Sequence, residues 1–273
     1  LMAGSVQPVQ TDKKEILTIN EKRRSYFQLH KDPLNYEVKG PKNLQIICRR
    51  AVPEKDNDKT WKYGYRIYVD DYAPVTVRHE TKKSIGVTSS QHPGHAYTHS
   101  GKYQLKIPGG EHKVRIEPLK TNSAPSLVRM ITKKVSKPDA KTTYVEPEGK
   151  KAPYHVLVGE KSIRYHEIPS ETALVYNFDG PVLTEFTNRL IFTDWMTGDD
   201  SYRIRVWDND KVMGTYYFTT ERSDFSSVKE DKTIVPGKWR SLNLTLDDGP
   251  HRLKLEILDK GKRVFIRAGI QEQ

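Results

Sequence analysis

Apolar and polar residues alternate along most of this chain with a period of two, which is the period of a half-buried strand. The alternating runs are about four to eight residues long and rich in Val, Ile, Tyr and Thr, and Gly, Pro, Asp or Asn separate them. No stretch sustains the 3.6-residue period of an amphipathic helix. The pattern therefore predicts an all-β protein built from antiparallel sheets.

The strand pattern occurs twice. Residues 107–119 read IPGGEHKVRIEPL and residues 246–258 read LDDGPHRLKLEIL, and each stretch is a turn followed by an alternating strand. Two further alternating segments, 34–41 and 174–181, both end at Gly-Pro, a strong turn signal. Identical residues recur 139 positions apart, as Gly110, His112, Glu117 and Leu119 and then as Gly249, His251, Glu256 and Leu258. A repeat of this length is the size of a domain, so the sequence predicts an internal duplication of one domain.

We expect two tandem, internally duplicated antiparallel β-sandwiches of Ig-like or jelly-roll type, over residues 15–136 and 154–270. Between them, residues 137–153 contain three prolines and little apolar pattern, which is typical of a semi-extended linker. Residues 1–14 are polar and expected to be flexible. Because the chain begins with Leu1 rather than Met, we expect a trimmed or processed product from which any signal peptide would already be gone.

Composition and charge refine this picture. Only 35% of the residues are hydrophobic, but 15 Tyr, 7 Phe and 4 Trp supply enough aromatic area to build a core. The net charge of +11 is uneven, with 29 basic and 16 acidic residues over 1–153 against 17 and 19 over 154–273. The single Cys48 makes no internal disulfide and is expected to be a small buried apolar residue. No apolar run approaches the roughly 18 residues of a membrane-spanning helix.

Histidines recur in two different ways. His112 and His251 occupy matching positions in the two copies, so we expect them to maintain a turn through hydrogen bonds to its carbonyl groups. The cluster His92, His95 and His99 occurs in the first copy only. Three imidazoles within eight residues match the ligand preference of zinc, copper or nickel, although no fourth ligand follows at an obvious spacing. The alternative is an exposed loop that contains histidine by chance.

Two sets of surface residues are candidates for ligand binding. Basic residues near aromatic ones in the first copy are suited to an anionic polymer such as a nucleic acid, a charged glycan or a lipid head-group layer. These basic residues are Lys22, Arg23, Arg24, Lys82 and Lys83. Candidate platforms for sugar stacking are the four tryptophans Trp61, Trp195, Trp207 and Trp239. The alternative is that the aromatic residues form the core of an apolar-poor sandwich and the cations its solvated face.

No phosphate loop, dinucleotide fingerprint, nucleophile elbow or zinc-protease motif is present, and we predict no catalytic residue and no cofactor. We therefore expect a non-catalytic structural or binding component of a periplasmic or extracellular, envelope-associated assembly. It would contact protein or glycan through its sandwich edges and loops. The alternatives are a carbohydrate-binding protein with Trp and Tyr platforms and a hydrolase or lyase on a β-sandwich scaffold. The oligomeric state stays open.

Overall fold

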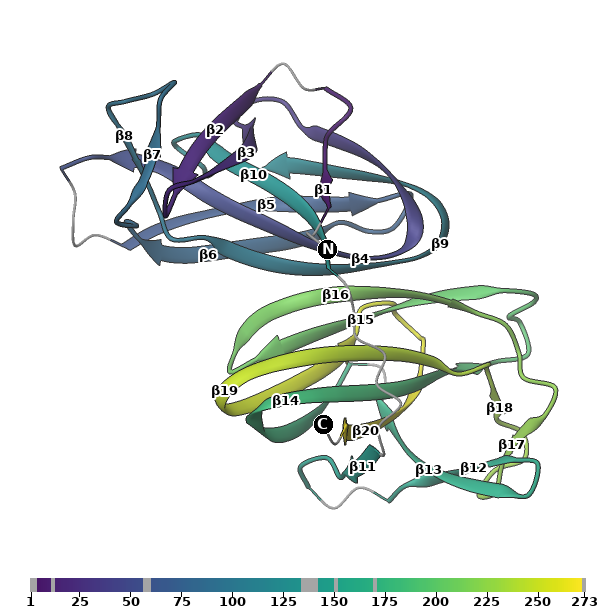
Figure 1. The fold of residues 1–273 in the computed structure, drawn as a ribbon. Helices are drawn as coiled ribbons and strands as arrows, with labels where there is room; N and C mark the ends of the chain where they lie inside the picture. Colours follow the sequence, from purple (N-terminus) through teal and green to yellow (C-terminus); the bar gives the residue numbers. More distant parts are fainter. Residues whose placement is uncertain are drawn as a thin grey trace. The chain divides into compact units, whose positions relative to one another are not determined.

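The fold consists of antiparallel β-strands (Figure 1). The computed structural model describes residues 4–10, 13–55, 60–133, 142–149, 152–168 and 171–271. The chain divides into two compact units, unit 1 (Leu1–Lys134) and unit 2 (Val135–Gln273). The predicted all-β, sandwich-like fold is confirmed. Across these described ranges, no helix has the length and apolar character needed to cross a membrane.

Unit 1 is organised around two long strands that pair along nearly their whole length. Its strands are β1 (Ser5–Val6), β2 (Lys14–Ile19), β3 (Lys22–Leu29), β4 (Leu34–Pro53), β5 (Thr60–Val69), β6 (Val75–Lys82), β7 (Val87–Ser89), β8 (His95–Tyr97), β9 (Gly101–Pro118) and β10 (Ser126–Lys133). Strand β4 pairs with β9, and β5 and then β6 extend the sheet on the other side of β9. Strand β10 pairs with the C-terminal half of β4. The long pair therefore belongs to both layers of the sandwich.

The change of layer takes place at Gly40. The register between β4 and β9 shifts between Gly40 and Lys42. A Cβ atom on Gly40 would lie 1.7 Å from the carbonyl oxygen of Pro108, so the two backbones approach too closely for any side chain. The bulge bends both strands, as an extra residue in one strand of a pair does.

Unit 2 repeats these pairings. Its strands are β11 (Thr142–Val145), β12 (Tyr154–Val158), β13 (Lys161–Ile168), β14 (Ala173–Phe192), β15 (Asp200–Asp208), β16 (Lys211–Thr220), β17 (Ser226–Val228), β18 (Val235–Pro236), β19 (Arg240–Ile257) and β20 (Val264–Gln271). Gly180 pairs with Gly249 as Gly40 pairs with Gly110, and a Cβ atom on Gly180 would lie 1.7 Å from the Asp247 carbonyl oxygen. The registers recur at offsets of 139 and 140 residues, which supports the predicted duplication of one domain.

The first strand of each unit lies in a segment for which the sequence predicted no regular structure. Within the expected flexible segment 1–14, β1 pairs with β10. Within the expected linker 137–153, β11 pairs with β20. These segments carry almost no apolar pattern, because backbone hydrogen bonds to a neighbouring strand hold them rather than a buried face. The motif Val-x-Pro, at Val6 and Val145, is the weak sequence signal that the two segments share.

Tyrosine side chains make up much of the core, which compensates for the low content of hydrophobic residues. Most of the largest fully buried side chains are tyrosines: Tyr36, Tyr65, Tyr97 and Tyr103 in unit 1, and Tyr165, Tyr176, Tyr202 and Tyr217 in unit 2. The hydroxyl of Tyr202 donates to Oδ1 of Asn188 at 2.5 Å. Cys48 is fully buried, and burial raises the pKa of its thiol to about 12. The core of this apolar-poor protein thus buries aromatic rings together with polar groups.

Replacement of Phe186 by Ala should destabilise unit 2 by about 3–5 kcal/mol, because the fully buried ring packs against Tyr176 and Phe178 and its loss leaves a cavity. The matched control is Phe225→Ala, in which an 81% exposed ring is removed and the change should stay within about 0.5 kcal/mol. Urea denaturation followed by tryptophan fluorescence measures both, since three of the four tryptophans lie in unit 2. Equal effects of the two substitutions would contradict the assignment of this core.

Candidate functional site

The residues that recur in both units maintain the fold. His112 Nδ1 lies 2.7 Å from Asp70, and His251 Nδ1 lies 2.8 Å from Asp208, while the other ring nitrogen of each histidine contacts a turn carbonyl. Burial of the His251 ring opposes protonation, but hydrogen bonds to Asp208 and to the Asp247 carbonyl raise its pKa above the ordinary value. The predicted bonds from these histidines to turn carbonyls are therefore present.

The predicted set of three metal-binding imidazoles is not brought together. His92 and His95 stack with ring centroids 5.4 Å apart, and His92 Nδ1 lies 3.0 Å from the buried carboxylate of Glu15. The chain is extended through β8, which places His99 about 13 Å from His95 along the strand direction. In the part of the chain that the structure describes, no group of three or more His, Cys, Asp and Glu side chains could hold a metal ion.

Two of the four candidate tryptophans do not present an open ring. The Arg50 guanidinium lies over the half-buried Trp61 ring, 4.9 Å from its centroid. The half-buried Trp207 donates from Nε1 to Glu256 at 2.9 Å, and the Lys254 ammonium lies 4.3 Å from its ring centroid. Long cationic side chains cover both rings, as they commonly cover apolar surface.

The predicted basic residues lie on two elements of unit 1. Lys22 and Arg23 are exposed at the start of β3, where Arg24 is half-buried. Lys82 is exposed at the end of β6, whereas Lys83 is half-buried and donates a hydrogen bond to the Glu54 carbonyl. These residues are placed as a solvated surface requires, and their binding to an anionic polymer stays a prediction.

The remaining two tryptophans and a third aromatic residue lie in loops of unit 2 that follow β14, β16 and β18, and the ends of β14 and β18 pair with each other. Trp195 is 70% exposed, Trp239 is 58% exposed and Phe225 is 81% exposed. They belong to three loops, 193–199, 221–225 and 237–239, which follow β14, β16 and β18. The sequence analysis missed Phe225, because a single phenylalanine in a polar turn gives no periodic signal.

Arg222 connects these three loops. Its Nη2 donates to the carbonyls of Thr193 and Met196, at 2.8 and 2.9 Å, and its backbone pairs with Gly237. Met196 is buried directly after the exposed Trp195 and anchors that loop in the core. The three rings are therefore carried by loops that are bonded to one another.

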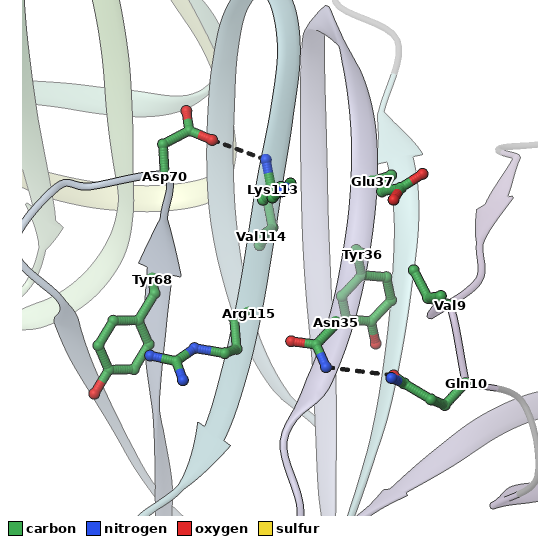
Figure 2. A pocket seen from close by; sticks show the side chains of 10 residues that line it. All are labelled: Val9, Gln10, Asn35, Tyr36, Glu37, Tyr68, Asp70, Lys113, Val114 and Arg115. Carbon is green, nitrogen blue, oxygen red and sulfur yellow. Dashed lines mark hydrogen bonds between the residues drawn. The ribbon is translucent and has the colours of Figure 1, made fainter.

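A pocket of about 470 Å³ lies on the outer face of unit 1, over β4, β9 and β5 (Figure 2). Figure 2 shows Tyr68 and Arg115 on one side of it, with the Arg115 guanidinium carbon 4.2 Å from the Tyr68 ring centroid. On the other side, Asn35 Nδ2 donates to Gln10 at 3.3 Å. None of the residues predicted as ligand-binding lines this pocket. Its lining is an alternating outer strand face, whose exposed polar residues look in sequence like any other solvated face.

A second hollow of unit 1, of about 500 Å³, contains His79. Its ring packs between Tyr63 and Tyr65, with centroids 5.3 and 5.7 Å away. A Cβ atom on Gly101 would lie 2.3 Å from the imidazole, so glycine is required for the ring to fit. Burial lowers the pKa of His79 to about 4. The imidazole is therefore neutral at neutral pH and acts as part of the core.

His79 should make unit 1 less stable in acid. The pKa of His79 is about 4 in the folded chain and about 6.5 in the unfolded one, so only the unfolded state gains a proton between these pH values. As the pH falls from 6.5 to 4, the free energy of unfolding therefore decreases by up to about 1.4 kcal/mol per pH unit. His79→Phe should remove this dependence, and replacement of the exposed His99 by Phe should not. Hydrogen exchange of β5 and β9 amides from pH 7 to pH 4 measures it, and identical profiles for wild type and His79→Phe would contradict it.

Comparison with known proteins adds no family assignment. No family model and no curated protein matches this chain. Among solved structures, it is similar to PNGF-II (9% identity, TM-score 0.27), covering 99% of this chain and 66% of that one, just under two thirds of its length. It is also similar to the CBM22-1–CBM22-2 tandem domain of Paenibacillus barcinonensis Xyn10C, with 9% sequence identity and a TM-score of 0.26 over 100% of this chain and 97% of that one. A third similar structure is the ANXUR1 extracellular domain of Arabidopsis thaliana, with 12% sequence identity and a TM-score of 0.25 over 100% of this chain and 95% of that one. Similarity this low carries no inference about function.

Proposed function

We propose that this protein is a non-catalytic binding component of a periplasmic or extracellular, envelope-associated assembly, and that it binds a glycan at one end of unit 2. The observation that carries this proposal is the group of three exposed aromatic side chains, Trp195, Phe225 and Trp239, on loops that Arg222 joins. We call this group the aromatic end. Large exposed aromatic side chains on adjoining loops are unusual on a soluble surface and mark an interaction site.

A glycan suits the aromatic end better than a purely apolar ligand does. Sugars present apolar C–H faces for stacking and hydroxyl groups that need donors and acceptors at the rim. The rim supplies both, because Glu221 and Lys238 form an ion pair of 2.6 Å between two of the loops. Rings on cross-linked loops also lose little conformational freedom on binding, which favours affinity.

The fold does not require these aromatic residues. At the offsets that relate the two units, Lys55 in unit 1 corresponds to Trp195 and Ser100 corresponds to Trp239. By contrast, Arg49 and Arg189 are retained in both units and donate to equivalent carbonyls, those of Thr98 and Gly237. A feature present in only one of two similarly built units is a better candidate for binding than a feature that both units share.

Replacement of Trp195 or Trp239 by Ala should weaken glycan binding by at least tenfold, since exposed aromatic anchors typically contribute more than about 1.4 kcal/mol. Binding is measured on a glycan array and then by titration calorimetry with the strongest hit. The matched control is Tyr144→Ala, which removes a 49% exposed ring from β11 and should leave affinity unchanged. An array without any hit, or equal losses for all three variants, would refute the proposal.

A further inference from the structure

The pocket of unit 1 is built from two rows of outward-facing residues. The register places Asn35 of β4 opposite Arg115 of β9, and Arg115 opposite Tyr68 of β5. In the adjacent row, Glu37 lies opposite Lys113. The pocket therefore combines two tyrosines, two cations, two carboxylates and two amides within about 470 Å³, a size typical of small-ligand sites. One of the carboxylates, Asp70, is already bonded to His112 and to the Lys113 backbone N–H.

Unit 2 holds a carboxylate at the corresponding place. Glu148 accepts hydrogen bonds from Arg252 at 3.0 and 2.9 Å and from Asn177 at 2.9 Å. Arg252 and Asn177 correspond to Lys113 and Glu37, the second row of the unit 1 pocket. The chain thus supplies its own anion to this face of unit 2.

In unit 1, Val9 takes the place of Glu148, so the described segment 4–10 supplies no carboxylate to the pocket, whose own lining includes Glu37 and Asp70. The backbone N–H of Val9 donates to the Asn35 carbonyl at 2.7 Å, and that of Glu148 donates to the Val175 carbonyl at the same distance. Asn35 and Val175 correspond. The segments that contain β1 and β11, residues 4–10 and 142–149, therefore run in the same register along their sheets, and we call them the leading segments. The Val9 side chain is 59% exposed and forms one edge of the pocket. The carboxylate that Glu148 provides in unit 2 therefore has no counterpart within residues 4–10 of unit 1.

We propose that the pocket of unit 1 binds a uronate residue of an acidic glycan, whose carboxylate is held by Arg115 and by Lys113, the residue at the position of Arg252 in unit 2. This inference extends the proposed glycan binding to a second site with its own ligand class. The Arg115 guanidinium has five N–H donors, of which the 2.8 Å ion pair with Glu117 uses Nη1, and guanidinium is suited to binding carboxylates. Lys113 adds a second cation beside it.

The other lining residues suit the hydroxyl groups of a sugar. Glu37 occupies the position that Asn177 has in unit 2. Its negative charge repels a ligand carboxylate, which is thereby directed toward Arg115. The Glu37 carboxylate then accepts hydrogen bonds from sugar hydroxyl groups. The amides of Asn35 and Gln10 offer both donors and acceptors. The basic excess of unit 1, with 25 basic residues against 13 acidic ones over residues 1–134, attracts an anionic chain to this unit.

The test is titration calorimetry of the full chain with uronate oligosaccharides prepared from polygalacturonate, alginate and hyaluronan. We expect binding of at least one, a loss of at least tenfold in Arg115→Ala, and a similar loss in Val9→Glu, which introduces the plugging carboxylate of unit 2. Because Val9 is exposed, this second variant should fold normally, as circular dichroism would verify. A neutral galactose trisaccharide should bind more weakly than its uronate counterpart.

Two controls give the result its meaning. Lys102→Ala removes an exposed cation outside the pocket and should leave uronate affinity unchanged. The variants Trp195→Ala and Trp239→Ala should also bind uronate normally, so that failure of the aromatic end and failure of this pocket are distinguishable. The proposal is overturned if none of the three uronates binds, if Val9→Glu and Arg115→Ala bind as wild type does, or if Lys102→Ala weakens binding as much as Arg115→Ala.

Discussion

The close approach of two backbones in the middle of a long strand pair determines the shape of each unit. At Gly40 and at Gly180, a carbonyl oxygen of the partner strand occupies the space that a side chain would need. The bulge at this point bends the pair, so one half of each long strand belongs to one layer and the other half to the second layer. All other strands attach to this bent pair directly or through a neighbour.

The same bend positions the outer sheet face on which the unit 1 pocket lies. In the part of β4 that precedes Gly40, the alternation of the strand turns the side chains of Tyr36 and Val38 inward and those of Asn35 and Glu37 outward. The inward set must be apolar or aromatic for the core to form, whereas the outward set is unconstrained by packing. A protein with two such units can therefore keep one core and vary the outer faces, and its leading segments show this in Glu148 and Val9.

The two proposed sites differ in how the fold supports them. The aromatic end depends on loops, and its precision comes from the hydrogen bonds of Arg222 and the buried Met196. The pocket depends on strands, and its precision comes from the registers that align Asn35, Arg115 and Tyr68. Loops tolerate large aromatic substitutions, while a sheet face offers rows of shorter polar groups. The two surfaces are thus suited to different parts of a glycan.

The sequence alone determined the strand content and the turn bonds of His112 and His251, and it led us to predict a duplicated domain, because alternation and fixed spacing are local or periodic signals. It named Trp195 and Trp239 as candidate stacking platforms, but it gave the same weight to Trp61 and Trp207. Only the tertiary structure decided that cations cover the latter two rings, since Lys254 lies beside Trp207 across a strand pair.

The assignment of β1 and β11 to sheets also required the tertiary structure, because backbone pairing leaves no side-chain pattern to detect. The same holds for the pocket, whose residues come from β4, β5, β9 and the leading segment and meet only through strand register. Periodicity tells which face of a strand is buried. It does not tell which strand lies next to it, and the chemistry of this protein's surfaces depends on those neighbours.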